Sequence, residues 1–468
     1  MSALALEIND LGLLALRGGA SRPEPESPGL ALLDGERLVV GAEAAGQAWT
    51  KPRFLHDAFW DHLDTQPVGR PFPPDVTRAD LAHAHILALR EGAAGGASEV
   101  VLVVPGSWSA PALGLLLSVA RAAGLPVVGL VDAAVAAASL GHPGQSLLHL
   151  DLTRHRSVLT EMAQGDEVVR LRVLSSERLG WQPFEEAFAA GIAARFVRET
   201  RFDPLHVGAT EQALHDALPG WLEELGLREA LTVGLAAGGR EHRIELTRAA
   251  LLAATADLYR GLVEQVGLVK RVGEPATLLL SARAARLPGL ADRFREIRDL
   301  ALAELPLGAA VAGALQHLER LRSRGEALPF VTRLPSGIGD ADRAALAAAA
   351  PAGPPAAGPG GARRPSGSPP THILNGSTAH AIGPEGLAVG TAPPPGVRGL
   401  ALRGETTGVS RHHCTLHAGD VDVVVEDHSS WGTLVNGERV DGRAVVHAGD
   451  RLRLGERELL LIAVAGEE

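Results

Sequence analysis

Three short stretches near the end of the chain place polar and charged side chains at turn positions. They are GVSRHHCTL (408–416), EDHSSWGTLVNG (426–437) and HAGDRLRLG (447–455). Ser410 and Arg411 are the kind of donors that bind a phosphate group through charge-assisted hydrogen bonds. Ser430 and Trp431 stand in the second stretch, and an exposed tryptophan is a frequent anchor for a partner protein. Trp431 is a candidate anchor of this kind, and packing of its side chain on its own domain is the alternative.

The residues around these stretches predict short strands separated by glycine turns. Val421–Val425 and Arg451–Leu454 alternate or run apolar, as half-buried strands do. Asn436-Gly437 fits a two-residue hairpin turn, because both central residues of such a turn need positive φ. About 98 residues with this strand spacing indicate an antiparallel β-sandwich.

The three stretches resemble, in order and spacing, the signature of forkhead-associated (FHA) domains. The resemblance implies an all-β FHA sandwich whose loops hold a phosphothreonine peptide. It assigns the phosphate contact to Ser410 with Arg411 beside it, and a peptide contact to Ser430. It also makes His413 a residue that supports the loop rather than touching the ligand. The remaining structural positions of the signature are Gly432, Asn436 and Gly437.

Two departures from the family pattern concern the phosphate and the peptide. The family has an arginine after the glycine that corresponds to Gly390, whereas this chain has Thr391. The family asparagine that grips the peptide backbone is replaced by Trp431. Arg398, in the proline-rich loop that follows, is a candidate substitute for the missing guanidinium group. A phosphothreonine partner and a non-phosphorylated partner both remain open at this point.

The larger N-terminal part alternates strands and helices. Leu4–Leu16 predicts a strand, a turn and a second strand, and Glu99–Val104 predicts a short buried strand. Apolar residues at helical spacing predict a helix over Ala110–Ala123, followed by a strand at Leu125–Leu130. An alanine-rich helix is expected at Asp132–Leu140. This order predicts an α/β fold with a parallel element.

Four segments of this part resemble the ATPase of DnaK-type heat-shock chaperones, which has an actin-like fold. They are Gly35–Pro52, Glu99–Ser139, Leu148–Leu159 and Leu278–Leu290. The resemblance spans roughly residues 4–300 and implies two similar lobes that face a shared nucleotide cleft. The alternative interpretation is a generic α/β domain.

Most positions that handle nucleotide in that family carry other residues here. ATP binding in this fold needs two glycine hairpins that cradle the phosphates, and carboxylates that hold magnesium waters. The corresponding positions, which are the candidate nucleotide-binding residues, are Glu7, Asn9, Asp151, Thr153, Arg154, His155 and Ser281. Only Asp151 keeps the family residue, and a triple glycine has become Thr153-Arg154-His155.

These replacements predict a pseudo-ATPase that is not an enzyme and has no catalytic residues. The side chains at 153–155 would crowd the backbone cradle that phosphates need. We therefore expect no cofactor, although binding of ATP and magnesium without hydrolysis stays open, because Arg154 and His155 offer charged donors.

Composition limits the partners and the compartment. The formal charge of −11 argues against a nucleic-acid or anionic-membrane surface, because both repel acidic proteins. Cys414 is the single cysteine, which excludes an intrachain disulfide and a cysteine-based zinc site, and no other metal motif is found. No apolar run is long enough for membrane insertion, and the start lacks the basic region of a secretory signal. We therefore expect a cytoplasmic protein.

The chain divides at a stretch rich in proline, glycine and alanine. We predict an actin-like, DnaK-type domain at 1–345, a flexible linker at 346–370 and the FHA sandwich at 371–468. The favoured function is a non-enzymatic adaptor or scaffold that binds protein partners through linked modules. The alternatives are an ATPase switch or chaperone-like protein of the DnaK and actin superfamily, and a filament-forming actin-like protein. The partners and the oligomeric state are left open.

Overall fold

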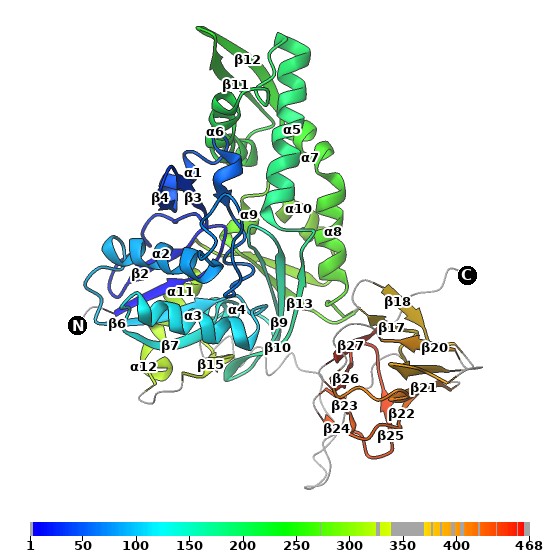
Figure 1. Cartoon of the computed structure of the whole chain (residues 1–468). Coiled ribbons are helices and arrows are strands. Elements are labelled where there is room, and N and C mark those ends of the chain that lie inside the picture. Colours follow the sequence, from blue (N-terminus) through cyan, green and yellow to red (C-terminus); the bar gives the residue numbers. More distant parts are fainter. Residues whose placement is uncertain are drawn as a thin grey trace. The chain divides into compact units, whose positions relative to one another are not determined.

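The computed structural model divides the chain into two compact units, Met1–Gly353 and Pro354–Glu468 (Figure 1). It describes residues 3–271, 273–323, 328–337, 369–375, 378–383, 386–394, 398–402, 407–419, 422–436, 438–455 and 457–462. The division falls within the predicted linker at 346–370, of which only residues 369 and 370 are described. Each unit is considered by itself.

The N-terminal unit is mixed α/β and begins with a mostly parallel sheet, the first sheet. Its strands, in the order β15-β7-β6-β1-β2, are β15 (Phe330–Val331), β7 (Val127–Asp132), β6 (Glu99–Val104), β1 (Ala3–Glu7) and β2 (Leu14–Arg17). β1 pairs antiparallel with β2 and parallel with β6, and β6 pairs parallel with β7. Helix α3 (Ala110–Ala122) connects β6 to β7, so the predicted strand–helix–strand unit is confirmed. The apolar run of β6 fits a strand that is buried on both faces.

A second sheet repeats this pattern later in the chain. Its order is β14-β13-β8-β9-β10-β16, with β14 (Leu300–Glu304), β13 (Ala276–Leu280), β8 (Ser146–Leu152), β9 (Ser157–Gln164), β10 (Glu167–Ser176) and β16 (Arg333–Pro335). β8 forms an antiparallel hairpin with β9 and pairs parallel with β13, which pairs parallel with β14. In both sheets the first strand of a hairpin thus adjoins two successive parallel strands. We call residues 3–132 the first lobe and residues 146–304 the second lobe.

Two helices are packed between the sheets. They are α4 (Ala133–Ala138) and α11 (Ala309–Gln316), and their buried small residues share one core cluster with both sheets. A Cβ at Gly313 would lie 1.8 Å from the Ala136 carbonyl oxygen, so the two helices can only be this close because position 313 is glycine. Small residues on both helices, with Gly313 at the contact, therefore allow the close approach of α4 and α11.

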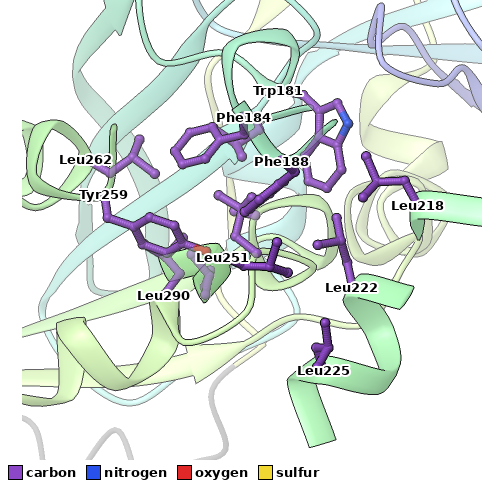
Figure 2. Close-up of a cluster of buried hydrophobic side chains, with 14 of the residues drawn as sticks. Trp181, Phe184, Phe188, Leu218, Leu222, Leu225, Leu251, Tyr259, Leu262 and Leu290 are labelled. Atoms are coloured by element: carbon purple, nitrogen blue, oxygen red, sulfur yellow. The ribbon is translucent and has the colours of Figure 1, made fainter. Parts of the chain in front are cut away.

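Further elements extend each lobe. The first lobe adds β3 (Ala31–Asp34), β4 (Arg37–Val40), α1 (Ala42–Ala45), η1 (Pro52–Phe54), β5 (Leu55–His56) and α2 (Arg78–Glu91). The second adds α5 (Trp181–Thr200), α6 (Gly208–Leu227), β11 (Ala230–Ala237), β12 (Arg240–Thr247), α7 (Arg248–Ala254), α8 (Ala256–Gly267), α9 (Ala282–Ala285) and α10 (Leu290–Arg295). Figure 2 shows how apolar side chains of α5, α6, α7, α8 and α10 gather into the core of the second lobe. No helix in the described ranges is both long and apolar enough to cross a membrane.

The last described part of this unit joins the two sheets. After α12 (Leu318–Leu321), residues 328–337 add β15 to the first sheet and, directly afterwards, β16 to the second. The Arg170 amide donates to the Thr332 carbonyl between the two strands at 3.0 Å. Leu334 is completely buried in the cluster between the sheets. We call residues 328–337 the bridging segment.

The C-terminal unit is a β-sandwich, as predicted. One sheet has the order β18-β17-β27-β26-β23-β24, with β18 (Thr378–Ala381), β17 (His372–Asn375), β27 (Arg457–Ile462), β26 (Arg451–Leu454), β23 (Thr433–Val435) and β24 (Glu438–Arg439). The other has the order β20-β19-β21-β22-β25, with β20 (Gly399–Ala401), β19 (Leu387–Gly390), β21 (Cys414–Ala418), β22 (Val423–Asp427) and β25 (Arg443–Val446). All pairings are antiparallel among the described strands except that of β19 with β20. Their inward side chains form a separate core.

Candidate functional site

Two loops of the C-terminal unit meet at Ser410. Ser410 lies between β20 and β21, and Ser430 lies between β22 and β23. The Ser430 amide donates a hydrogen bond to Ser410 Oγ at 3.3 Å. Both predicted ligand contacts are therefore brought together, although they are 20 positions apart in the sequence.

His413 supports the Ser410 loop from inside the sandwich. Its side chain is completely buried, and its Nδ1 accepts a hydrogen bond from the Ser410 amide at 3.0 Å. Burial lowers the pKa of His413, so the ring is neutral at pH 7 and carries its proton on Nε2. A neutral, buried ring can position Ser410 but cannot itself contact a ligand.

The turn after β22 presents Trp431 to solvent. Asp427 Oδ1 accepts hydrogen bonds from the Ser429 amide at 3.0 Å and from Thr433 Oγ1 at 2.8 Å. The Gly432 amide donates to Ser429 Oγ at 2.7 Å. Burial alone would raise the pKa of Asp427, but the bonds from Ser429 and Thr433 lower it overall. The hydrogen bonds of Asp427 and Ser429 thus fix the turn, and Trp431 is 76% exposed.

Arg398 does not reach this site. The Ser410 loop meets the sheet at the end of β19, where the Thr391 amide donates to the Ser410 carbonyl at 3.1 Å. Arg398 lies before β20, beside the opposite end of β19, and its Nη1 is 3.5 Å from where a Gly383 Cβ would stand. The prediction that Arg398 replaces the missing guanidinium group is therefore corrected by the strand register.

Two other exposed arginines belong to segments that contact this turn or the Ser410 loop. Arg411 is exposed directly after Ser410. Arg439, which was not predicted, ends the short strand β24 and lies against Gly432. We find no ion pair between either arginine and a carboxylate of the described residues. The sequence held one signal for Arg439, because a two-residue hairpin at 436–437 folds the chain back toward the turn that precedes β23.

Asn436 has a structural role in that hairpin. Its φ is +52°, its Nδ2 donates to Asp450 Oδ1 at 2.6 Å, and its Oδ1 accepts from the Arg451 amide at 2.9 Å. These bonds tie β23 to β26. Gly437, predicted as the second turn residue, lies outside the described residues.

In the N-terminal unit, the turns of the two hairpins contact each other directly. Asn9 Nδ2 donates to Asp151 Oδ2 and to the Leu152 carbonyl, each at 3.2 Å. The Arg154 amide donates to Asp10 Oδ1 at 2.6 Å. The first hairpin turn (residues 8–13) and the second (residues 153–156) are therefore bonded across the space that separates the lobes.

Arg283 is the central residue of this interface, and it was not predicted. It follows the candidate residue Ser281, whose Oγ caps helix α9 by accepting from the Ala284 amide at 3.1 Å. The Arg283 side chain reaches into the first lobe, where Nη1 lies 2.6 Å from Glu7 Oε1 and Nε lies 3.0 Å from Glu26 Oε1. Nη1 also lies 3.9 Å from Asp151 Oδ2. One buried guanidinium group thus lies between carboxylates of both hairpins.

The pKa values at this cluster follow from burial and from these partners. Burial raises the pKa of Glu7, although Arg283 opposes this shift. Burial would lower the pKa of Arg283, but Glu7, Asp151 and Glu26 raise it overall. The arginine is therefore charged at any physiological pH.

The second hairpin turn uses its side chains to hold the first lobe. Arg154 Nε lies 3.2 Å from Asp57 Oδ2, and His155 Nε2 lies 3.0 Å from the Asp57 carbonyl oxygen. Arg156 forms an ion pair with Asp61. Thr153 Oγ1 accepts from the Arg156 amide at 3.1 Å and closes the turn. The side chains of Arg154 and His155 thus already have carboxylate and carbonyl partners.

The cavity between the hairpins is small. The cavity there, lined by Glu7, Ala133, His149, Asp151 and Arg283 among others, has a volume of about 30 Å³. This volume holds one or two water molecules, whereas small-molecule pockets usually have roughly 300–1,000 Å³. In the part of the chain that the structure describes, no group of three or more His, Cys, Asp or Glu side chains is suited to hold a metal ion.

Comparison with known proteins identifies a family in the C-terminal unit. The search of curated proteins finds no match to this chain. The family model of the FHA domain matches residues 400–455, which include Ser410, His413, Trp431 and Arg439. The match covers both loops of the site and the hairpin that carries Arg439. The C-terminal unit therefore contains an FHA domain.

Proposed function

We propose that this protein is a non-enzymatic adaptor whose FHA domain binds a partner protein at a phosphothreonine. The observation that carries the proposal is the Ser410–Ser430 hydrogen bond, which aligns two loops beside Arg411 and the exposed Trp431. A hydroxyl group and a guanidinium group without a carboxylate partner among the described residues bind phosphate, and Trp431 adds apolar contact area. Thr391 in place of arginine leaves this site with one cation fewer than the family pattern.

We further propose that the N-terminal unit is an actin-like, DnaK-type fold that has become a pseudo-ATPase. The repeated sheet pattern and the central pair of helices support the relationship. The Arg283 cluster supports the loss of nucleotide binding, because its guanidinium group lies between the carboxylates that would otherwise face magnesium. In this proposal the unit serves as a rigid body for other contacts, and joining it to the FHA domain raises the local concentration of two partners.

The proposed binding of phosphothreonine by the FHA domain, here called the reader role, is tested with the full chain and matched peptide pools. A degenerate pool with fixed phosphothreonine is expected to bind in fluorescence anisotropy, and the same pool without phosphate is not. Ser410→Ala should weaken phosphopeptide binding roughly tenfold, since a bond to a charged group contributes about 1.5–3 kcal/mol. Ser118→Ala, an exposed serine on α3, is the control and should have no effect. Thr391→Arg should strengthen binding by restoring the missing cation. Equal binding of both pools would refute the proposal.

The pseudo-ATPase role is tested by calorimetric titration of ATP and ADP with magnesium into the full chain. We expect no saturable heat and no phosphate release. Saturable binding, or hydrolysis that disappears in Asp151→Ala, would contradict this part of the proposal and leave the reader role untouched.

A further inference from the structure

The guanidinium group of Arg439 lies against the backbone of Gly432. A Cβ built on Gly432 would stand 2.6–3.0 Å from Nε, Cζ and Nη2 of Arg439. Gly432 has a φ of +91°, which favours glycine, and its missing side chain is what admits the guanidinium group. Arg439 is therefore held next to Trp431, the residue before Gly432.

The charge of Arg439 has no partner among the described side chains. Two other arginines of the same unit do have partners, because Arg443 pairs with Glu426 at 2.7 Å and Arg451 pairs with Glu458. The nearest carboxylate in the turn, that of Asp427, already accepts hydrogen bonds from Ser429 and Thr433. An exposed guanidinium group that is held in place and unpaired is suited to a carboxylate or phosphate oxygen pair.

Ser410 and Arg439 each contact one sequence neighbour of Trp431. Ser410 contacts the amide of Ser430, and Arg439 contacts Gly432. Residues 430 and 432 are at most roughly 7 Å apart, because each residue of a chain spans no more than about 3.3–3.6 Å. An extended peptide that lies along this loop therefore advances about two residues between the two positions.

We propose that Arg439 forms a second anion-binding position of the FHA domain, next to Trp431 and separate from the phosphate position at Ser410. The partner it selects is a phosphothreonine peptide with another acidic group about two residues away. This inference rests on the proposed function of the domain as a phosphopeptide reader. The second group is a carboxylate or a phosphate, which present the same oxygen pair to the guanidinium group.

The test compares three labelled peptide pools on the full chain by fluorescence anisotropy. All carry a fixed phosphothreonine; the first has neutral flanks, the second has glutamate two residues before or after it, and the third has a second phosphothreonine there. Arg439→Gln is expected to weaken binding of at least one of the two pools with a second acidic group about tenfold. Binding of the first pool should change less than about twofold. Arg439→Lys keeps the charge without the planar fork and should recover part of the loss.

The control variant is Arg443→Gln, which removes an exposed positive charge on the other sheet. It should affect all three pools equally and weakly. A larger loss for the third pool than for the second assigns the position to phosphate, and equal losses assign it to any acidic group. The inference fails if Arg439→Gln weakens all pools to the same extent or none of them. If the first pool binds and depends on Ser410, such a failure leaves the proposed function standing. If no pool binds, both fail.

Discussion

Arg283 is a single buried cation in a cluster of carboxylates. Glu7, Glu26 and Asp151 surround its guanidinium group in a site from which water is largely excluded. Removing the cation leaves buried carboxylates without compensation, which costs far more than losing a surface ion pair. The side chain therefore stabilises the contact between the lobes.

We predict that Arg283→Ala lowers the unfolding free energy of the N-terminal unit by about 3–5 kcal/mol. Arg286→Ala is the matched control, since Arg286 binds the same Glu26 but is 42% exposed, and it should cost about 0–1 kcal/mol. Urea unfolding of both variants measures the difference. Equal losses of unfolding free energy would show that burial of Arg283 does not increase its contribution to stability.

His85 makes the first lobe sensitive to acid. Trp60 Nε1 donates to His85 Nδ1 at 3.1 Å, and Ser27 Oγ lies 2.8 Å from Nε2. Burial lowers the pKa of His85 to about 4, whereas an unfolded histidine has a pKa of roughly 6.5. Because the folded form binds its proton less readily, the stabilisation is complete above pH 6.5 and falls as pH drops toward 4.

For this histidine we predict a loss of about 2 kcal/mol in unfolding free energy between pH 7 and pH 5, at about 1.36 kcal/mol per unit of pKa difference. His85→Gln keeps an acceptor and a donor but does not titrate. The variant should be less stable at pH 7 and should lose less stability than the parent chain on going to pH 5. Urea unfolding at both pH values measures this, and parallel losses in the two chains would contradict it.

At the scale of elements, the bridging segment is the part that closes the N-terminal unit. Residues 328–337 contribute an edge strand to each sheet, and the Thr332 carbonyl accepts from the Arg170 amide between them. Arg170 also forms an ion pair at the end of β7, where its Nη1 lies 2.8 Å from Asp132 Oδ2. A segment with so few residues depends on its one fully buried apolar side chain, Leu334.

We expect Leu334→Ala to cost about 2–5 kcal/mol, the range for removing a buried leucine side chain. Arg333→Ala, the exposed neighbour on the same strand, should cost under about 1 kcal/mol. In hydrogen exchange, the Arg170 amide should lose protection in the first variant and keep it in the second. Retained protection in Leu334→Ala would mean that the backbone pairing holds the segment without the side chain.

At the scale of the whole molecule, the two units have separate cores. Every member of the FHA core lies at Ile373 or beyond, whereas the other clusters lie wholly within the N-terminal unit. Cooperative unfolding requires shared buried contacts, so each unit should unfold by its own transition.

We therefore predict that residues 1–337 and 369–468, produced separately, each unfold at the same midpoint as the corresponding transition of the full chain. Thermal scans followed by circular dichroism measure this at matched concentrations. A fragment that is unfolded, or whose midpoint moves by more than about 4 °C, would indicate that the units stabilise each other.

The sequence by itself determined the local elements and the family signature. The β6–α3–β7 unit and the hairpin at Asn436 follow from apolar periodicity and turn chemistry, which act between near neighbours in the chain. The FHA signature is likewise a run of short motifs, and the family match at 400–455 supports it.

Only the tertiary structure decided which charges meet. Arg283 and Glu7 are 276 positions apart, and their contact depends on how two separate sheets approach each other. Arg398 was expected at the phosphate site, but strand register placed it at the opposite end of β19, while a hairpin brought Arg439 against Gly432. Pairing of side chains that are distant in the sequence depends on the packing of whole elements. A local sequence pattern does not predict which distant residues come into contact.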